Sequence, residues 1–121
     1  MNRKKIEEVE ELRKRAGSVV AYYPKLARAI KSVKACLFLC QLLYWQGKGK
    51  KGDWIYKSRK DMLEETGLSR VEQENARKAL KKLGIIKEKL EGIPPTIHYK
   101  INFSKLNESI NKYEAEVDEL F

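Results

Sequence analysis

Side chains able to hydrogen-bond DNA bases recur at helical spacing between residues 70 and 81. On a wheel of about 100° per residue, one side of this segment carries Arg70, Glu74, Arg77 and Lys81, with Gln73 and Lys78 flanking them. Arg and Gln can bind guanine and adenine edges through two hydrogen bonds at once. The candidates for base contact are therefore Arg70, Gln73, Glu74, Arg77 and Lys81. The same charges also form opposite-sign pairs at i,i+3 and i,i+4, as on any solvated helix.

The start of this helix is well specified. Ser69 with Glu72 three residues later predicts a capping box, and Gly67-Leu68-Ser69 supplies a tight turn before it. Ser58 with Asp61 marks another helix start, which predicts a first helix over residues 59–65. The apolar back of the second helix is expected to hold Glu72, Ala76, Ala79, Leu80 and Leu83. A helix, a turn and a basic helix therefore follow one another.

Two strands are predicted directly after the basic helix, over residues 85–90 and 96–103. Their connection, Gly92-Ile93-Pro94-Pro95, reads as a hairpin tip. In the second strand, the alternation places Ile97, Tyr99, Ile101 and Phe103 inward and Thr96, His98, Lys100 and Asn102 outward. This order of elements is the second half of a winged helix-turn-helix. The fold class expected is α+β, mainly helical, with additional N- and C-terminal helices.

The whole chain of 121 residues is expected to form a single domain. It consists of a charged helix over 3–16, a winged-helix core over 20–103 and a C-terminal helix over 104–121. Within the core we expect an extended run over 19–23, a short helix over 24–30, a central helix over 33–46 and a strand over 53–57. The central helix is apolar on all sides and must be buried on all sides. The N-terminal helix, the C-terminal helix or a second subunit are the candidate covers. The C-terminal helix carries a two-heptad apolar seam of Leu106, Ile110, Tyr113, Val117 and Leu120. Self-association and packing within the chain explain this seam equally well.

The net charge of +9 is unevenly distributed. Residues 24–60 carry ten Lys or Arg against the single Asp53, whereas residues 104–121 are acidic. A concentrated positive region suggests a polyanionic partner on one side, although a Lys-rich inert surface or a solvated loop over 47–52 would look similar. The candidates for DNA phosphate contact are Lys48, Lys50, Lys51, Lys57, Arg59, Lys60, Lys78 and Lys100.

Other chemistries find little support in the sequence. Cys36 and Cys40 lack further zinc ligands besides the distant His98, so they are expected to be buried free thiols in a reducing cytoplasm. We expect no enzyme activity, cofactor, metal, signal peptide or membrane span, because no catalytic constellation or long apolar run is present. Trp54 and Tyr56 could stack on bases, but they also fit one face of a short core strand.

Four segments together resemble a known family: YYPKLARAIKSVKACLFLCQLLYW, GDWIYKS, ETGLSR with the following basic helix, and the G-PPTIHYKI hairpin. Over about residues 20–103 the chain is similar to the winged-helix domain of phage and mobile-element replication proteins, which are related in style to the N-terminal domains of DnaD-type primosome proteins. The resemblance implies double-stranded DNA binding in replication initiation, often as a homodimer and with other replication proteins as possible partners. A transcriptional regulator using the same surface, or a protein-interaction module, are the alternative interpretations.

Overall fold

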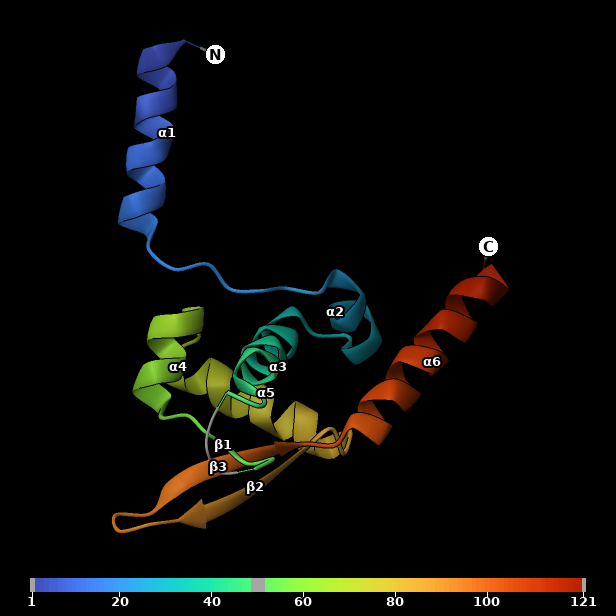
Figure 1. The fold of residues 1–121 in the computed structure, drawn as a ribbon. Coiled ribbons are helices and arrows are strands. Elements are labelled where there is room, and N and C mark those ends of the chain that lie inside the picture. The colour runs from blue at the N-terminus through green and yellow to red at the C-terminus, as the bar shows by residue number, and fades with distance from the viewer. Residues whose placement is uncertain (1, 49–51, 121) are drawn as a thin grey trace.

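The computed structural model describes residues 2–48 and 52–120, which form an α+β, mainly helical architecture (Figure 1). The elements in chain order are α1 (Arg3–Ala16), α2 (Pro24–Ile30), α3 (Val33–Trp45), β1 (Ile55–Tyr56), α4 (Arg59–Thr66), α5 (Arg70–Lys82), β2 (Ile86–Glu91), β3 (Thr96–Ile101) and α6 (Phe103–Leu120). The strands form an antiparallel sheet of order β1-β3-β2. Every helix predicted from the sequence is present, with ends that differ by no more than one residue from those expected.

Helix α3 lies at the centre of the core. Its side chains Phe38, Leu39 and Leu42 have no exposed surface, and Phe38 meets Tyr99 of β3 edge-to-face with ring centroids 5.4 Å apart. The elements packed around it are α2, α4, α5 and β3. These elements of the same chain bury most of α3, but Val33 and Tyr44 near its two ends stay 57% and 49% exposed, so the helix is not buried on all sides as expected.

Side-chain caps fix where the helices near the sheet begin. The hydroxyl of Ser58 accepts a hydrogen bond from the backbone N–H of Asp61, and Ser69 and Glu72 exchange both bonds of a capping box. Helix α4 ends at Gly67, whose φ of +77° lies in the left-handed region that favours glycine. Leu68 follows as a buried side chain. A short, anchored turn thus sets the path from α4 into α5.

The end of β3 differs from the sequence prediction. The backbone N–H of Asn102 donates to the carbonyl of Ile85 at 2.7 Å, and its side-chain oxygen accepts from the N–H of Lys105 at 3.1 Å. The side-chain bond caps the next helix, so the chain leaves the strand at Asn102 and α6 already begins at Phe103. The Phe103 side chain is exposed and not inward as predicted, whereas Tyr99 and Ile101 are buried as expected.

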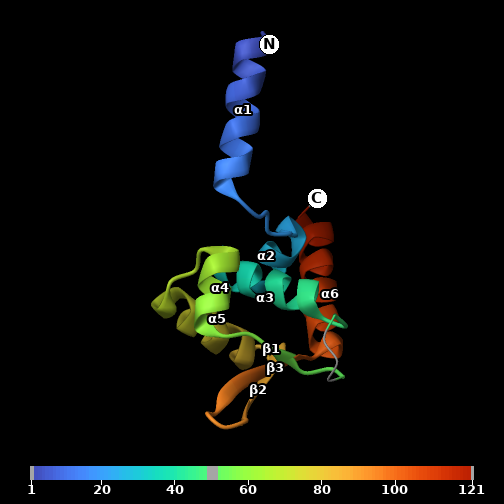
Figure 2. The same cartoon turned by 60° about the vertical axis from the view of Figure 1, so that its left-hand side comes forward.

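The two terminal helices behave differently. Helix α6 packs along α2: Leu106 is buried, Ile110 contacts the core and Arg28 donates to the Tyr113 hydroxyl at 3.3 Å. The first half of the predicted seam is therefore used within the chain, while Leu120 near its end stays exposed. Helix α1 extends away from the other elements in both views (Figures 1 and 2), and none of its residues is buried.

Truncating Phe38 should be far more costly than truncating an aromatic residue at the end of the same helix. We expect Phe38→Ala to lower the free energy of unfolding by about 3–5 kcal/mol, because it leaves a cavity between α3 and β3. The matched control is Tyr44→Ala, because Tyr44 is half exposed, and it should cost less than about 1 kcal/mol. Urea denaturation measures both values. Equal costs would contradict the placement of the core.

Candidate nucleic-acid interface

The outward side of α5 is not the side expected from the helical wheel. The buried residues of this helix are Gln73, Ala76 and Leu80. The opposite side carries four exposed residues, Val71, Asn75, Lys78 and Lys82. We call these four residues the α5 stripe. Val71 of this stripe is 63% exposed.

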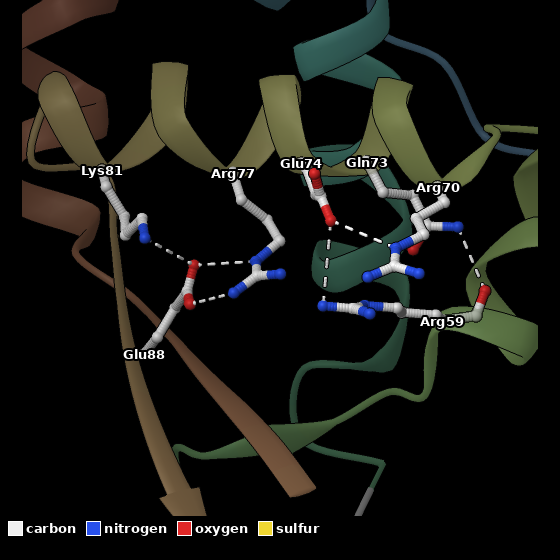
Figure 3. Close-up of polar contacts among 7 residues, drawn as sticks. All are labelled: Arg59, Arg70, Gln73, Glu74, Arg77, Lys81 and Glu88. Atoms are coloured by element: carbon white, nitrogen blue, oxygen red, sulfur yellow. Dashed lines mark hydrogen bonds and ion pairs between the residues drawn. The ribbon is translucent and has the colours of Figure 1, made fainter.

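Gln73 was predicted to contact bases, and this placement is wrong. Its side chain is only 4% exposed. Its amide nitrogen donates to the carbonyl of Arg59 at 3.0 Å (Figure 3) and to that of Leu68 at 2.9 Å. The bonds join α5 to the start of α4 and to the turn between the two helices. Gln73 therefore holds the turn, and it is not available to a ligand.

Arg77 is likewise not free. Its guanidinium forms two hydrogen bonds with the Glu88 carboxylate on β2, at 3.0 and 2.7 Å, and Lys81 approaches the same carboxylate at 3.3 Å (Figure 3). Both Arg77 and Glu88 side chains are about 85% buried, with 15% and 14% exposed. Burial alone would raise the pKa of Glu88, but the hydrogen bonds from Arg77 together with the charges of Arg77 and Lys81 offset it and hold the pKa below its ordinary value. The hydrogen bonds to Glu88 raise the pKa of Arg77 in turn.

A second, looser cluster lies at the N-terminal end of α5. Glu74 accepts from Arg70 at 3.3 Å and lies 3.9 Å from a guanidinium nitrogen of Arg59 (Figure 3). The Arg70 side chain is 72% exposed, so this pairing is easily exchanged with solvent or a ligand. Arg70, Glu74 and Lys81 thus remain accessible at the edge of the α5 stripe, whereas Gln73 and Arg77 do not.

The candidates for phosphate contact differ in how exposed their side chains are. Lys57 is removed from the set, because its side chain is only 9% exposed and ion-pairs with Glu65. Exposed cations remain at Arg59, Lys60 and Lys78, and at Lys48, whose ammonium lies 3.7 Å from the Tyr44 ring centroid. Lys100 is half exposed beside Asp53, at 4.0 Å. Lys50 and Lys51 lie outside the described residues.

His98 lies on the outer face of the sheet as predicted, yet it is buried there. Its partners on the neighbouring strands are Tyr56 and Lys89, and the Tyr56 ring centroid lies 5.5 Å from that of the imidazole. The short strand β1 places Tyr56 beside it, which covers a position that a two-stranded hairpin would leave open. His98 therefore presents little surface on this face of the sheet.

The remaining functional predictions concern thiols, metals and membranes. Cys36 and Cys40 are buried and free, as expected, with their sulfur atoms 3.6 Å apart. Within residues 2–48 and 52–120, no group of three or more His, Cys, Asp or Glu side chains could hold a metal ion. None of the helices in that part of the chain has the length and apolar character needed to cross a membrane.

Three residues of the α5 stripe were missed by sequence reasoning: Val71, Asn75 and Lys82. The available signal was the spacing of positions 73, 76 and 80, which is the i, i+3, i+7 pattern of a buried helical face. Counting Gln73 as polar concealed that pattern.

Comparison of the chain with models of protein families, with curated proteins and with solved structures gave no match.

Removing the Glu88 carboxylate should lower the stability of the fold and make that stability less dependent on pH in the acidic range. We expect Glu88→Gln to lower the free energy of unfolding at pH 7 by about 1–3 kcal/mol, because Arg77 loses its charged partner in a mostly buried site. The folded pKa of Glu88 is depressed, so the carboxylate stabilises fully above its unfolded pKa of about 4.3. That contribution disappears as the pH falls through the folded pKa.

Urea denaturation of both proteins between pH 7 and pH 2 measures the difference. It should be constant near neutrality and shrink below about pH 4. Glu108→Gln is the control, because its pair with Lys105 at 3.2 Å is more than half exposed on both sides. A difference for Glu88→Gln as small as that of Glu108→Gln would show that the pair does not join α5 to β2.

Proposed function

We propose that the protein is a winged-helix protein that binds double-stranded DNA, with α5 as the helix that enters the major groove. The observation that carries this proposal is the α5 stripe, because it leaves amide and ammonium groups exposed along a helix whose other side is packed on the core. The turn before α5 and the β2–β3 hairpin after it support the same interpretation. Binding without catalysis is part of the proposal.

The chemistry of the stripe suits groove recognition. Asn75 can bind an adenine edge bidentately, and Val71 can contact a thymine methyl group. Lys78 and Lys82 can neutralise phosphates on either side of the groove, with Arg59 and Lys60 adding charge from the start of α4. Arg70, Glu74 and Lys81 remain base-contact candidates at the edge of the stripe. Arg77 could contact a base only if its hydrogen bonds to Glu88 were broken.

We further propose that the protein acts in the cytoplasm in replication initiation of a phage or mobile element. The replication role rests on the resemblance of residues 20–103 to such proteins, and the two buried free thiols fit a reducing compartment. A transcriptional regulator would use the same α5 stripe. The two roles differ in the DNA they require, since an initiator must also handle DNA strands that have been separated.

Neutralising the α5 stripe should weaken duplex binding without unfolding the protein. Lys78→Ala/Lys82→Ala removes two exposed ammonium groups, and we expect affinity for every duplex to fall and the slope of log K against log salt to flatten by up to about 0.9 per lost contact. Asn75→Ala should instead cost about 1–3 kcal/mol on a preferred sequence and little on random DNA. Fluorescence anisotropy at several salt concentrations measures both effects.

The matched control is Lys105→Ala/Lys112→Ala, which removes the same charge from exposed positions of α6. It should leave the salt slope almost unchanged, because α6 does not belong to the proposed interface. Equal losses in the two double variants would mean that net charge alone governs binding, and would overturn the assignment of α5.

We also propose that the protein forms a homodimer, in which α1 packs on the distal half of α6 from a second copy. An isolated helix of 14 residues is marginal in water, and α1 exposes Ile6 and Leu12 at 44% and 65%. Basic residues lie at both ends of α1, whereas residues 114–119 of α6 are acidic and lead to the exposed Leu120. Two basic domains related by a two-fold axis could then bind paired half-sites.

Deleting residues 1–17 should convert the dimer into a monomer. Because α1 contributes no buried residue, the truncated chain should keep the far-UV circular dichroism of its other helices and its core stability. Sedimentation velocity at tens of micromolar measures the state of both chains. A full-length monomer, or a dimer that survives the deletion, would contradict the role given to α1.

A further inference from the structure

The outer face of the sheet gathers aromatic rings and lysines. In an antiparallel pair, residues directly opposite each other share a face, and Tyr56 and Lys89 both lie opposite His98. Tyr99, opposite Ile55 and Glu88, belongs to the inner face that meets α3 and α5. The face bearing Tyr56 and His98 is therefore turned away from α5, and the surfaces of the two are separate.

A cavity of about 660 Å³ lies beside this face. Its walls include the rings of Trp45, Trp54, Tyr56 and His98, the cations of Lys48 and Lys57, and the carboxylates of Asp61 and Glu91. The volume falls within the range of about 300–1,000 Å³ that is usual for ligand clefts, and such clefts are lined mainly by apolar and aromatic groups. The size and the flat walls suit planar ring systems.

The walls of the cavity are held in place by a hydrogen-bonded network behind them. The Glu65 carboxylate accepts from the indole nitrogen of Trp45 at 2.7 Å and also from Gln41 and Lys57. Lys57 in turn lies 4.0 Å from the Trp45 ring centroid. Burial alone would raise the pKa of Glu65, but these donors lower it, so the carboxylate stays charged and the network stays intact. A ligand therefore finds Trp45 already ordered.

Two lysine ammonium groups lie near the ring of Trp54. Lys89 and Lys100 lie 4.3 and 5.8 Å from the Trp54 ring centroid, and both also approach carboxylates, Glu91 and Asp53 respectively. A cation over an exposed ring is held more weakly than a stacked nucleobase. A base could thus displace an ammonium, and the freed lysine would be placed to bind the adjoining phosphate.

We propose that this cavity binds unpaired bases of single-stranded DNA. Aromatic platforms interleaved with cations are the recurring design for single strands, because every base has a face that can stack and every linkage has a phosphate. Duplex DNA does not fit the same site, since the faces of its bases are already stacked on one another. The proposal does not depend on duplex binding by the α5 stripe.

Both tryptophans of the chain line the cavity, so tryptophan fluorescence, excited selectively over that of the six tyrosines, reports on this site. The probe is an oligothymidylate of about ten nucleotides, compared with an abasic oligomer of the same length and charge. We expect the oligothymidylate to quench the tryptophan fluorescence and to bind roughly 10- to 100-fold more tightly than the abasic oligomer. Equal binding of the two would overturn the proposal, because phosphate attraction alone would then explain it.

Substitution at Tyr56 tests the site with a matched control. Tyr56→Leu should weaken oligothymidylate binding about 10-fold or more, whereas Tyr56→Phe keeps a ring and should bind nearly as the unaltered protein does. Tyr23→Leu is the control, because Tyr23 is as exposed as Tyr56, at 54% against 49%, but lies before α2. Loss of binding in Tyr56→Phe or Tyr23→Leu equal to that in Tyr56→Leu would overturn the stacking role.

The duplex proposal and the single-strand proposal can be tested independently. Lys78→Ala/Lys82→Ala should leave the quenching by oligothymidylate within about twofold of that in the unaltered protein, and Tyr56→Leu should leave duplex affinity unchanged within the same limit. Failure of the α5 variants to affect duplex binding would overturn only the duplex proposal. Fluorescence that does not respond to oligothymidylate would overturn only the single-strand proposal.

Discussion

The burial of α3 is the constraint on which the rest of the structure depends. A helix with apolar residues around its whole circumference requires extensive cover. Elements α2, α4, α5 and β3 supply most of it, and of its apolar residues only Val33 and Tyr44, near its ends, stay exposed. The contact with α5 fixes which side of that helix faces inward, because Ala76 and Leu80 are buried. The contact between Phe38 and Tyr99 fixes which face of the sheet is internal. Both candidate surfaces are thus consequences of how one apolar helix is enclosed.

Electrostatics then decide which cations are available. Arg77 and Lys81 share the Glu88 carboxylate, and Arg59 and Arg70 share Glu74. Arg77 is mostly buried, and separating it from Glu88 would leave a charge without its partner in a poorly solvated site. Lys78 and Lys82 carry no such restraint among the described residues, so the positive charge offered to solvent by α5 lies on the stripe. Arg77 contributes more to the α5–β2 junction than to any external contact.

The sequence predicted most of the elements but not the roles of several polar residues. Capping patterns and apolar periodicity located the helices, since both signals are local. Gln73, Lys57 and His98 were assigned to the surface because polar side chains usually lie there, whereas each is held by contacts that the sequence pattern does not show. Gln73 binds carbonyls at positions 59 and 68, Lys57 binds Glu65, and Tyr56 covers His98. Phe103 was misplaced because alternation along a strand does not show where Asn102 ends it.

The separation of the two proposed surfaces bears on biological role. The α5 stripe and the aromatic cavity lie on different sides of the sheet, so duplex and single-stranded DNA would not compete for the same groups. Reading a duplex does not require a site that stacks unpaired bases. A protein acting where strands separate meets both forms of DNA within a few nucleotides of each other. Binding of both forms through independent residues would therefore favour replication initiation over transcriptional control, a distinction that the α5 stripe alone cannot provide.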